Sequence, residues 1–131
     1  MAALDPEDLD VWKLSMSLVT ALYRETAQWP DSERFGLISQ IRRAAVSVPT
    51  NIAEGHGRST TREYLRFLDI ADGSLAEVRT LLQIACSIEF ATAESTEKYL
   101  TEARQVGRLL GGLKRALRKK LRGPEQQGPT Q

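Results

Sequence analysis

The stretch "TTREYLRFLDIADGSLAEVRTLLQIACSIEF", residues 60–90, decides the fold class. Its apolar side chains return every three or four residues, which is the spacing of one face of an α-helix. Thr60, followed three positions later by Glu63, fits a capping box at the start of this helix. We expect a long amphipathic helix that ends near Phe90, with an apolar face formed by Tyr64, Leu68, Ala71, Leu75, Val78, Leu82 and Ala85.

The same period appears near the N-terminus. Asp5 is a suitable N-cap, Pro6 suits the first helical position, and the helix must end before Trp29-Pro30. The main apolar face is expected to hold Leu9, Trp12, Met16, Val19 and Tyr23. A neighbouring stripe contains Val11, Leu14, Leu18 and Leu22. Because one helix of a lone bundle needs only one buried face, the surplus stripe favours contacts between subunits.

A second helix is expected to start near Asp31 or Ser32 and to end at the glycines Gly55 and Gly57. Pro49 interrupts its backbone hydrogen bonds and predicts a kink. Its apolar seam comprises Leu37 or Ile38, Ile41, Ala45, Val48 and Ile52.

The last helix is expected to begin at the cap Thr92 and to end before Gly123-Pro124. Its seam comprises Tyr99, Ala103, Val106, Leu110, Leu113, Leu117 and Leu121. Four long amphipathic helices with short connections predict an all-α, antiparallel up-down four-helix bundle. This single domain should occupy residues 1–122, and the polar segment 123–131 should be a disordered C-terminal tail.

Composition limits the setting of this bundle. A chain of 131 residues suits one domain with a real core. The sequence has no apolar run long enough to cross a membrane and no secretion signal at its start. The single cysteine, Cys86, cannot form an internal disulfide. We therefore expect a soluble cytoplasmic protein.

A row of polar side chains runs beside the apolar seam of the second helix. Its members recur at helical spacing, and the row consists of Gln40, Arg43, Ser47, Asn51, Glu54 and Arg58. Glu77 on the third helix is a candidate counter-ion for Arg43 or Arg58. Such a row is either solvated or part of a buried hydrogen-bonded network. We favour a structural network that fixes helix register over a ligand or catalytic site.

Catalytic motifs are weak in this sequence. Gly57-Arg58-Ser59-Thr60 resembles a phosphate-binding loop, but a helix precedes it and Arg58 stands where such loops carry lysine, so we reject nucleotide hydrolysis. His56 is the only histidine, which excludes a multi-histidine metal site within one chain. Cys86 lies among apolar residues and is more simply a core residue than a nucleophile. We expect no enzymatic activity, no metal and no cofactor.

The net charge is only +1, but the basic residues are unevenly distributed. Six of them crowd the end of the last helix: Lys114, Arg115, Arg118, Lys119, Lys120 and Arg122. They either complement the helix dipole or contact phosphates. Arg42, Arg62 and Arg66 are further candidate phosphate contacts if they face outward.

Two blocks carry a family resemblance. "FGLISQIRRAAVSVPTNIAEGHGRST", followed by "EYLRFLDIADGSLAEVRTLL", resembles the bacterial four-helix-bundle family named for the protein encoded in intervening sequences of 23S ribosomal RNA genes. The most specific pieces are residues 40–45, residues 51–55 with Arg58, and residues 71–77. The resemblance implies an up-down bundle that assembles as a homopentamer around a central channel. The accessory variability protein of diversity-generating retroelements is similar, and it works with a reverse transcriptase and nucleic acid.

Three functions remain open at this point. The first is a non-enzymatic, homo-oligomeric protein that associates with structured RNA or another nucleic acid. The second is an assembly scaffold or adapter that binds a protein partner and no nucleic acid. The third is binding of a small ligand near Asn51 and Glu54. We prefer the first because of the resemblance, the excess of arginine over lysine and the basic end of the last helix.

Overall fold

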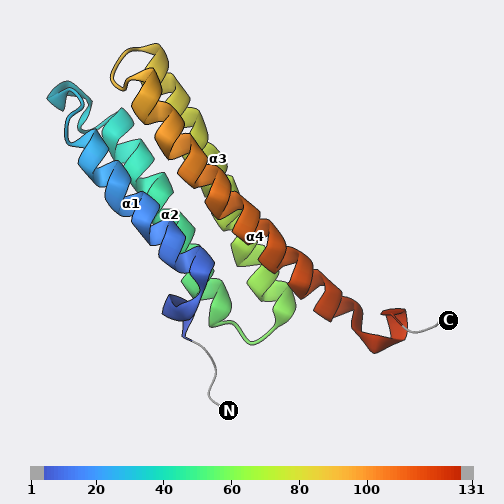
Figure 1. Cartoon of the computed structure of the whole chain (residues 1–131). Coiled ribbons are helices and arrows are strands. Elements are labelled where there is room, and N and C mark those ends of the chain that lie inside the picture. Colours follow the sequence, from blue (N-terminus) through green and yellow to red (C-terminus); the bar gives the residue numbers. More distant parts are fainter. Residues whose placement is uncertain (1–4, 128–131) are drawn as a thin grey trace.

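The computed structural model describes residues 5–127, and in this range the chain is all-α, with four α-helices and no strand (Figure 1). The helices are α1 (Asp10–Thr26), α2 (Leu37–His56), α3 (Thr61–Ser87) and α4 (Ala93–Gln127). Each helix packs against its neighbour along the chain, and α4 also packs against α1, which closes the bundle. Successive helices run in opposite directions, so the start of α3 lies beside the later part of α4.

Two predicted N-caps are confirmed. Thr60 Oγ1 accepts a hydrogen bond from the Glu63 amide at 3.1 Å, and Thr92 Oγ1 accepts one from the Ser95 amide at 3.0 Å. The end of α3 was predicted about three residues too late. The helix ends at Ser87, and Glu89 adopts a left-handed backbone with φ 67°, which turns the chain toward α4.

The predicted starts of the first two helices are wrong. Asp5 begins only a short 3₁₀ turn, η1 (Pro6–Asp8), and α1 starts at Asp10 after an extended residue. Another 3₁₀ turn, η2 (Asp31–Glu33), precedes α2, which starts at Leu37. The Glu33 carboxylate accepts a hydrogen bond from the Leu37 amide at 3.0 Å, so the first turn of α2 is satisfied from outside the helix.

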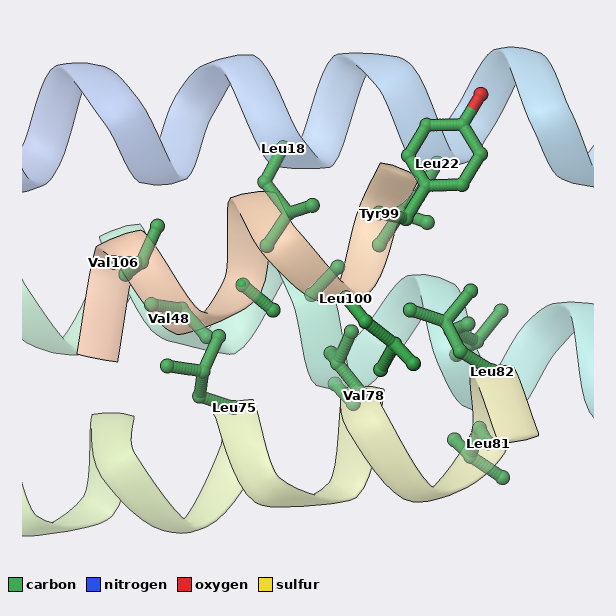
Figure 2. Close-up of a cluster of buried hydrophobic side chains, with 14 of the residues drawn as sticks. Leu18, Leu22, Val48, Leu75, Val78, Leu81, Leu82, Tyr99, Leu100 and Val106 are labelled. Carbon is green, nitrogen blue, oxygen red and sulfur yellow. The ribbon is translucent and has the colours of Figure 1, made fainter. Parts of the chain in front are cut away.

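The core lies along the bundle axis and draws on all four helices. Its members include Leu18 and Leu22 of α1, Val48 of α2, Leu75 of α3 and Val106 of α4 (Figure 2). In α1 the stripe assigned to subunit contacts is buried in the core more deeply than the predicted main face, of which Leu9, Trp12 and Val19 pack against the core and are partly buried. Val11, Leu18 and Leu22 are buried, whereas Met16 and Tyr23 are 37% and 41% exposed. Ser15 can share the buried face because its hydroxyl donates to the Trp12 carbonyl at 2.8 Å.

The proline of the second helix does not end it. Pro49 is buried inside α2, which continues through it.

Helix α4 runs past the end of the other helices (Figure 1), so Leu110 is fully buried, Leu117 only partly, and Leu121 is 39% exposed. Gly123, with φ 69°, breaks the helix, which resumes to Gln127. Disorder of residues 123–131 stays a prediction, and residues 128–131 lie outside the described range.

None of the helices described in residues 5–127 is long and apolar enough to cross a membrane.

Candidate nucleic-acid interface

Part of the polar row on α2 forms a hydrogen-bonded cluster. Asn51 Nδ2 donates to the Ser47 carbonyl at 2.8 Å and to Ser47 Oγ at 2.9 Å. Ser74 Oγ on α3 donates to Ser47 Oγ at 2.8 Å, which joins the two helices. Ser74 was not identified from the sequence, although it stands beside the buried Leu75 inside a block that carries the family resemblance. These three side chains fix the relative position of α2 and α3.

The other members of the predicted network make no hydrogen bond or ion pair with this cluster among the described residues. Gln40, Arg43 and Glu77 line a polar hollow of about 380 Å³ between α2 and α3. Within residues 5–127, no ion pair connects Glu77 to Arg43 or to Arg58. Glu54 is exposed and has no hydrogen bond to the serine and asparagine cluster among the described side chains.

Arg58 instead packs against an aromatic ring at the start of α3. Its guanidinium carbon lies 4.6 Å from the ring centroid of Phe67, and that of Arg66 lies 5.8 Å from the same ring. Attraction between a cation and the face of a ring holds such side chains in place without neutralising them. Both guanidinium groups are therefore oriented at the surface and keep their charge for an external anion.

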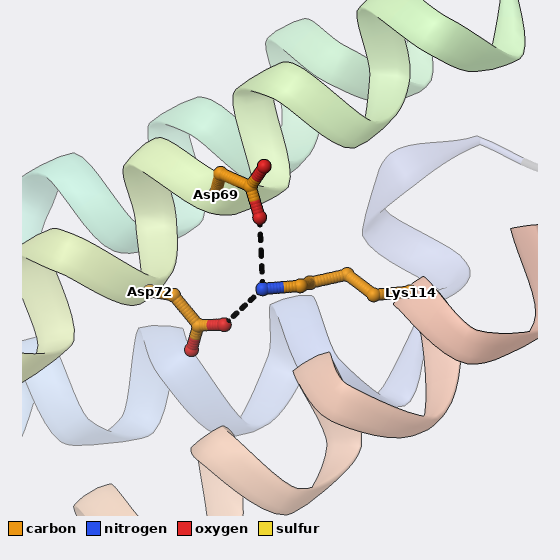
Figure 3. A network of polar contacts seen from close by, with 3 residues as sticks. All are labelled: Asp69, Asp72 and Lys114. Carbon is orange, nitrogen blue, oxygen red and sulfur yellow. Dashed lines mark hydrogen bonds and ion pairs between the residues drawn. The ribbon is translucent and has the colours of Figure 1, made fainter. Parts of the chain in front are cut away.

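Two predicted phosphate contacts are engaged inside the chain. Lys114 Nζ lies 2.9 Å from Asp69 and 2.5 Å from Asp72, between α4 and α3 (Figure 3). Its side chain is only 12% exposed. Burial lowers the pKa of Lys114, but hydrogen bonds and charge attraction from Asp72 and Asp69 outweigh burial and raise that pKa overall. Lys114 thus serves the helix interface rather than a phosphate.

Arg42 is the second of these residues. Its guanidinium donates to Thr26 Oγ1 at 2.8 Å and to the Tyr23 carbonyl at 3.1 Å, and it stacks 4.4 Å from the Tyr23 ring centroid. These bonds add to those that Thr26 Oγ1 and the Tyr23 carbonyl already make at the C-terminal end of α1, and they hold Arg42 of α2 against that end. Thr26 is buried and was not identified from the sequence.

The other predicted bases gather at one end of the bundle. Because α3 and α4 are antiparallel, the start of α3 meets the end of α4 there. Arg58, which was predicted to belong to the polar row of α2, joins them. This group of exposed bases, named the basic end from here on, consists of Arg58, Arg62, Arg66, Arg115, Arg118, Lys119, Lys120 and Arg122.

A hollow of about 240 Å³ lies between the bases near the start of α3 and those near the end of α4. It is lined by His56, Arg58, Ser59, Thr60, Thr61, Tyr64, Leu117 and Lys120. None of these lining residues is acidic. The residues that the structure describes hold no group of three or more His, Cys, Asp or Glu side chains suited to a metal ion.

These features define a class of protein: an all-α helical bundle with a basic end. The chain belongs to the 23S rRNA-intervening sequence protein family, whose model matches residues 7–112. A crystal structure of a protein of unknown function from the S23 ribosomal protein family of Bacteroides thetaiotaomicron has a TM-score of 0.74 with this chain at 20% identity. The likeness covers 80% of this chain and 95% of that one and concerns the fold. No curated protein sequence matches the chain.

Proposed function

We propose that this chain is a non-enzymatic, homo-oligomeric protein that associates with structured RNA through the basic end. The observation that carries the proposal is the meeting of α3 and α4 bases at one end of a chain whose net charge is only +1. Clustered lysine and arginine side chains bind phosphates by releasing counterions. The name of the family, which refers to intervening sequences of 23S rRNA, supports RNA as the partner.

Two apolar surfaces support self-association. One is a hollow of about 430 Å³ between α1 and α2, whose apolar lining includes Trp12, Met16, Val19, Val46 and Pro49. The other lies on α3 around the exposed Ile84 and Ile88. Two different apolar surfaces on one subunit suit a head-to-tail contact, which forms a ring such as a pentamer when the rotation between subunits closes. A ring would also repeat the basic end and increase RNA affinity through multivalency.

Binding of a labelled RNA hairpin, followed by fluorescence anisotropy at several salt concentrations, tests the proposal. We expect the affinity for RNA to fall steeply as the salt concentration rises. The plot of the logarithm of the association constant against the logarithm of salt concentration should become less steep by roughly one unit for each phosphate contact removed. Lys120→Gln should weaken binding and reduce the slope. Lys98→Gln removes the same charge from the opposite end of α4 and should leave binding unchanged.

RNA binding that does not change with salt, or equal losses in both variants, would contradict this interface. The second candidate is an assembly scaffold without nucleic acid, which the same two apolar surfaces favour. An oligomer of constant mass that fails to bind RNA even at low salt would support this second function instead.

A further inference from the structure

The hollow at the basic end is assembled from three separate segments. His56 is the last residue of α2, Arg58 lies in the turn before α3, and Lys120 belongs to the last part of α4. These three bases line one concave space of about 240 Å³. The stretch Gly57-Arg58-Ser59-Thr60, unsuited to nucleotide hydrolysis, thus lies where it can bind an anion without any reaction.

Ring contacts position two of these bases. The Arg58 guanidinium stacks on Phe67, and the His56 ring meets the Tyr64 ring edge-on, with centroids 5.9 Å apart and planes at 86°. Side chains that are already oriented lose less conformational entropy when they bind a ligand. The ring contacts therefore restrict the Arg58 and His56 side chains before an anion arrives.

Hydroxyl groups complete the lining. Ser59, Thr61 and Tyr64 also line the hollow, and each carries a hydroxyl group that can donate a hydrogen bond. Burial raises the pKa of Tyr64 above its ordinary value of 10.0, so its phenol stays protonated and remains a donor near neutral pH. A ligand rich in acceptor oxygens and negative charge matches this set of donors.

The number of charges distinguishes between kinds of phosphate. A phosphomonoester carries about −1.5 to −2 charges near neutral pH and three acceptor oxygens, whereas a backbone phosphodiester carries one charge. Two permanent cations, Arg58 and Lys120, together with the His56 imidazole, surround a space whose described lining contains no carboxylate. We propose that this hollow binds a phosphomonoester, either the terminal phosphate of an RNA strand or that of a free phosphorylated small molecule.

The RNA source rests on the proposed function, whereas binding of a free phosphate does not. The first experiment titrates the protein with inorganic phosphate and with adenosine monophosphate, using adenosine as the uncharged control, and follows amide shifts by NMR. We expect saturable shifts at residues 56–61 and around Lys120 with both phosphates and none with adenosine.

The second experiment compares two RNA strands of identical sequence that carry either a 5′-phosphate or a 5′-hydroxyl. The phosphorylated strand should bind roughly ten- to a hundredfold more tightly, the gain expected for about one added charge-assisted hydrogen bond. Lys120→Gln and Arg58→Gln should each abolish the preference for the phosphorylated strand, whereas Lys98→Gln should keep it. These residues are exposed, so thermal unfolding should confirm that all three variants fold.

The outcomes separate the two proposals. Phosphate binding at these residues without any RNA binding supports the hollow and overturns the RNA function. Equal affinity for both strands, together with the absence of saturable phosphate shifts, overturns the hollow and leaves the RNA function intact. A preference for phosphate that survives both Lys120→Gln and Arg58→Gln would place the site elsewhere and overturn this inference.

Discussion

At the scale of single residues, two glycines inside helices have opposite surroundings. A Cβ at Gly55 would lie 2.8 Å from Phe67 Cβ and 3.0 Å from Tyr64 Cδ1, so α2 and α3 approach closely only because no side chain intervenes. A Cβ at Gly73 would meet nothing within 4 Å. The absence of a side chain is therefore required at Gly55 and is merely unfavourable for the helix at Gly73.

Gly55→Ala should lower the free energy of unfolding by about 1–3 kcal/mol, because the helices must separate to admit the methyl group. Gly73→Ala should raise it by about 0.5–1 kcal/mol through better helix propensity. Urea unfolding followed by circular dichroism measures both changes. Equal effects of the two substitutions would show that the contact at Gly55 does not decide the packing.

Lys114 should contribute measurably to stability. Lys114→Met leaves Asp69 and Asp72 without their shared cation, and we expect a loss of about 1–2 kcal/mol, moderated because Asp69 is 59% exposed. Lys98→Met, on the exposed surface of the same helix, should change the free energy of unfolding by less than about 0.5 kcal/mol. A loss of similar size in both variants would mean that the ion pairs contribute nothing specific.

The pH dependence of the stability that these two ion pairs contribute follows from the raised pKa of Lys114. A folded-state pKa above the ordinary 10.5 supplies stability that is fully present below pH 10.5 and is lost as pH rises through the folded value. The stability difference between wild type and Lys114→Met should thus be constant from pH 7 to 9 and should shrink above pH 10.5. A difference that shrinks as pH falls from 9 to 7 would contradict this assignment.

The sequence shows which residues are basic, but not which of them form hydrogen bonds or ion pairs with other residues of the chain. Arg42 and Lys114 carry the same charge as their exposed neighbours, and only their partners distinguish them. Thr26 lies 16 residues from Arg42, and Asp72 lies 42 residues from Lys114. No local pattern reveals contacts that depend on how the helices are packed.

At the scale of the elements, the N-cap of α3 can be tested by itself. Thr60→Ala removes the acceptor of the Glu63 amide and should cost about 0.5–2 kcal/mol. Thr80→Ala removes a hydroxyl inside the same helix, where the exposed group only donates to the Ala76 carbonyl, and should be neutral or slightly stabilising. Thermal unfolding compares the two, and an equal loss would argue against a specific role of the cap.

Some helix starts can be predicted from the local sequence alone, whereas others cannot. Thr60 and Thr92 each cap a helix with an oxygen that binds an amide three residues later, so the sequence alone predicts both starts. The start of α2 depends on Glu33, which reaches the Leu37 amide from a separate turn. In α1 both stripes are apolar, so the local pattern does not show which one is buried more deeply, and Ser15 can lie on the buried face because its hydroxyl bonds within its own helix.

At the scale of the whole molecule, the apolar surfaces predict the assembly. Val46 is 40% exposed and lines the hollow between α1 and α2, so a charge there should not disturb the fold of one subunit. Light scattering after size exclusion should give a wild-type mass near five times 14.6 kDa, and Val46→Asp should reduce it.

Thr20→Asp, at an exposed position of α1 outside this hollow, is the control and should keep the wild-type mass. A wild-type mass of one subunit would overturn the homo-oligomer. An unchanged mass in Val46→Asp would place the subunit contact on another surface.

The overall arrangement was predictable because it depends on helical periodicity, which each segment carries in its own sequence. The basic end required more, since residues 58–66 and 115–122 meet only when α3 and α4 pack in antiparallel order. The sequence places bases in both segments, whereas the structure shows that they share one end, where Arg58 and Lys120 line one hollow.

The ion pairs of Lys114 also bear on the proposed RNA function. Asp69 and Asp72 carry two negative charges against the single charge of Lys114, so this part of α3 and α4 should disfavour phosphates. The bases of the basic end lie farther toward the start of α3 and, on α4, within about 12 Å beyond Lys114 as far as Arg122. If RNA binds there as proposed, a single subunit should cover only a short stretch of it, and affinity should rise in steps as the strand grows long enough to bridge neighbouring copies.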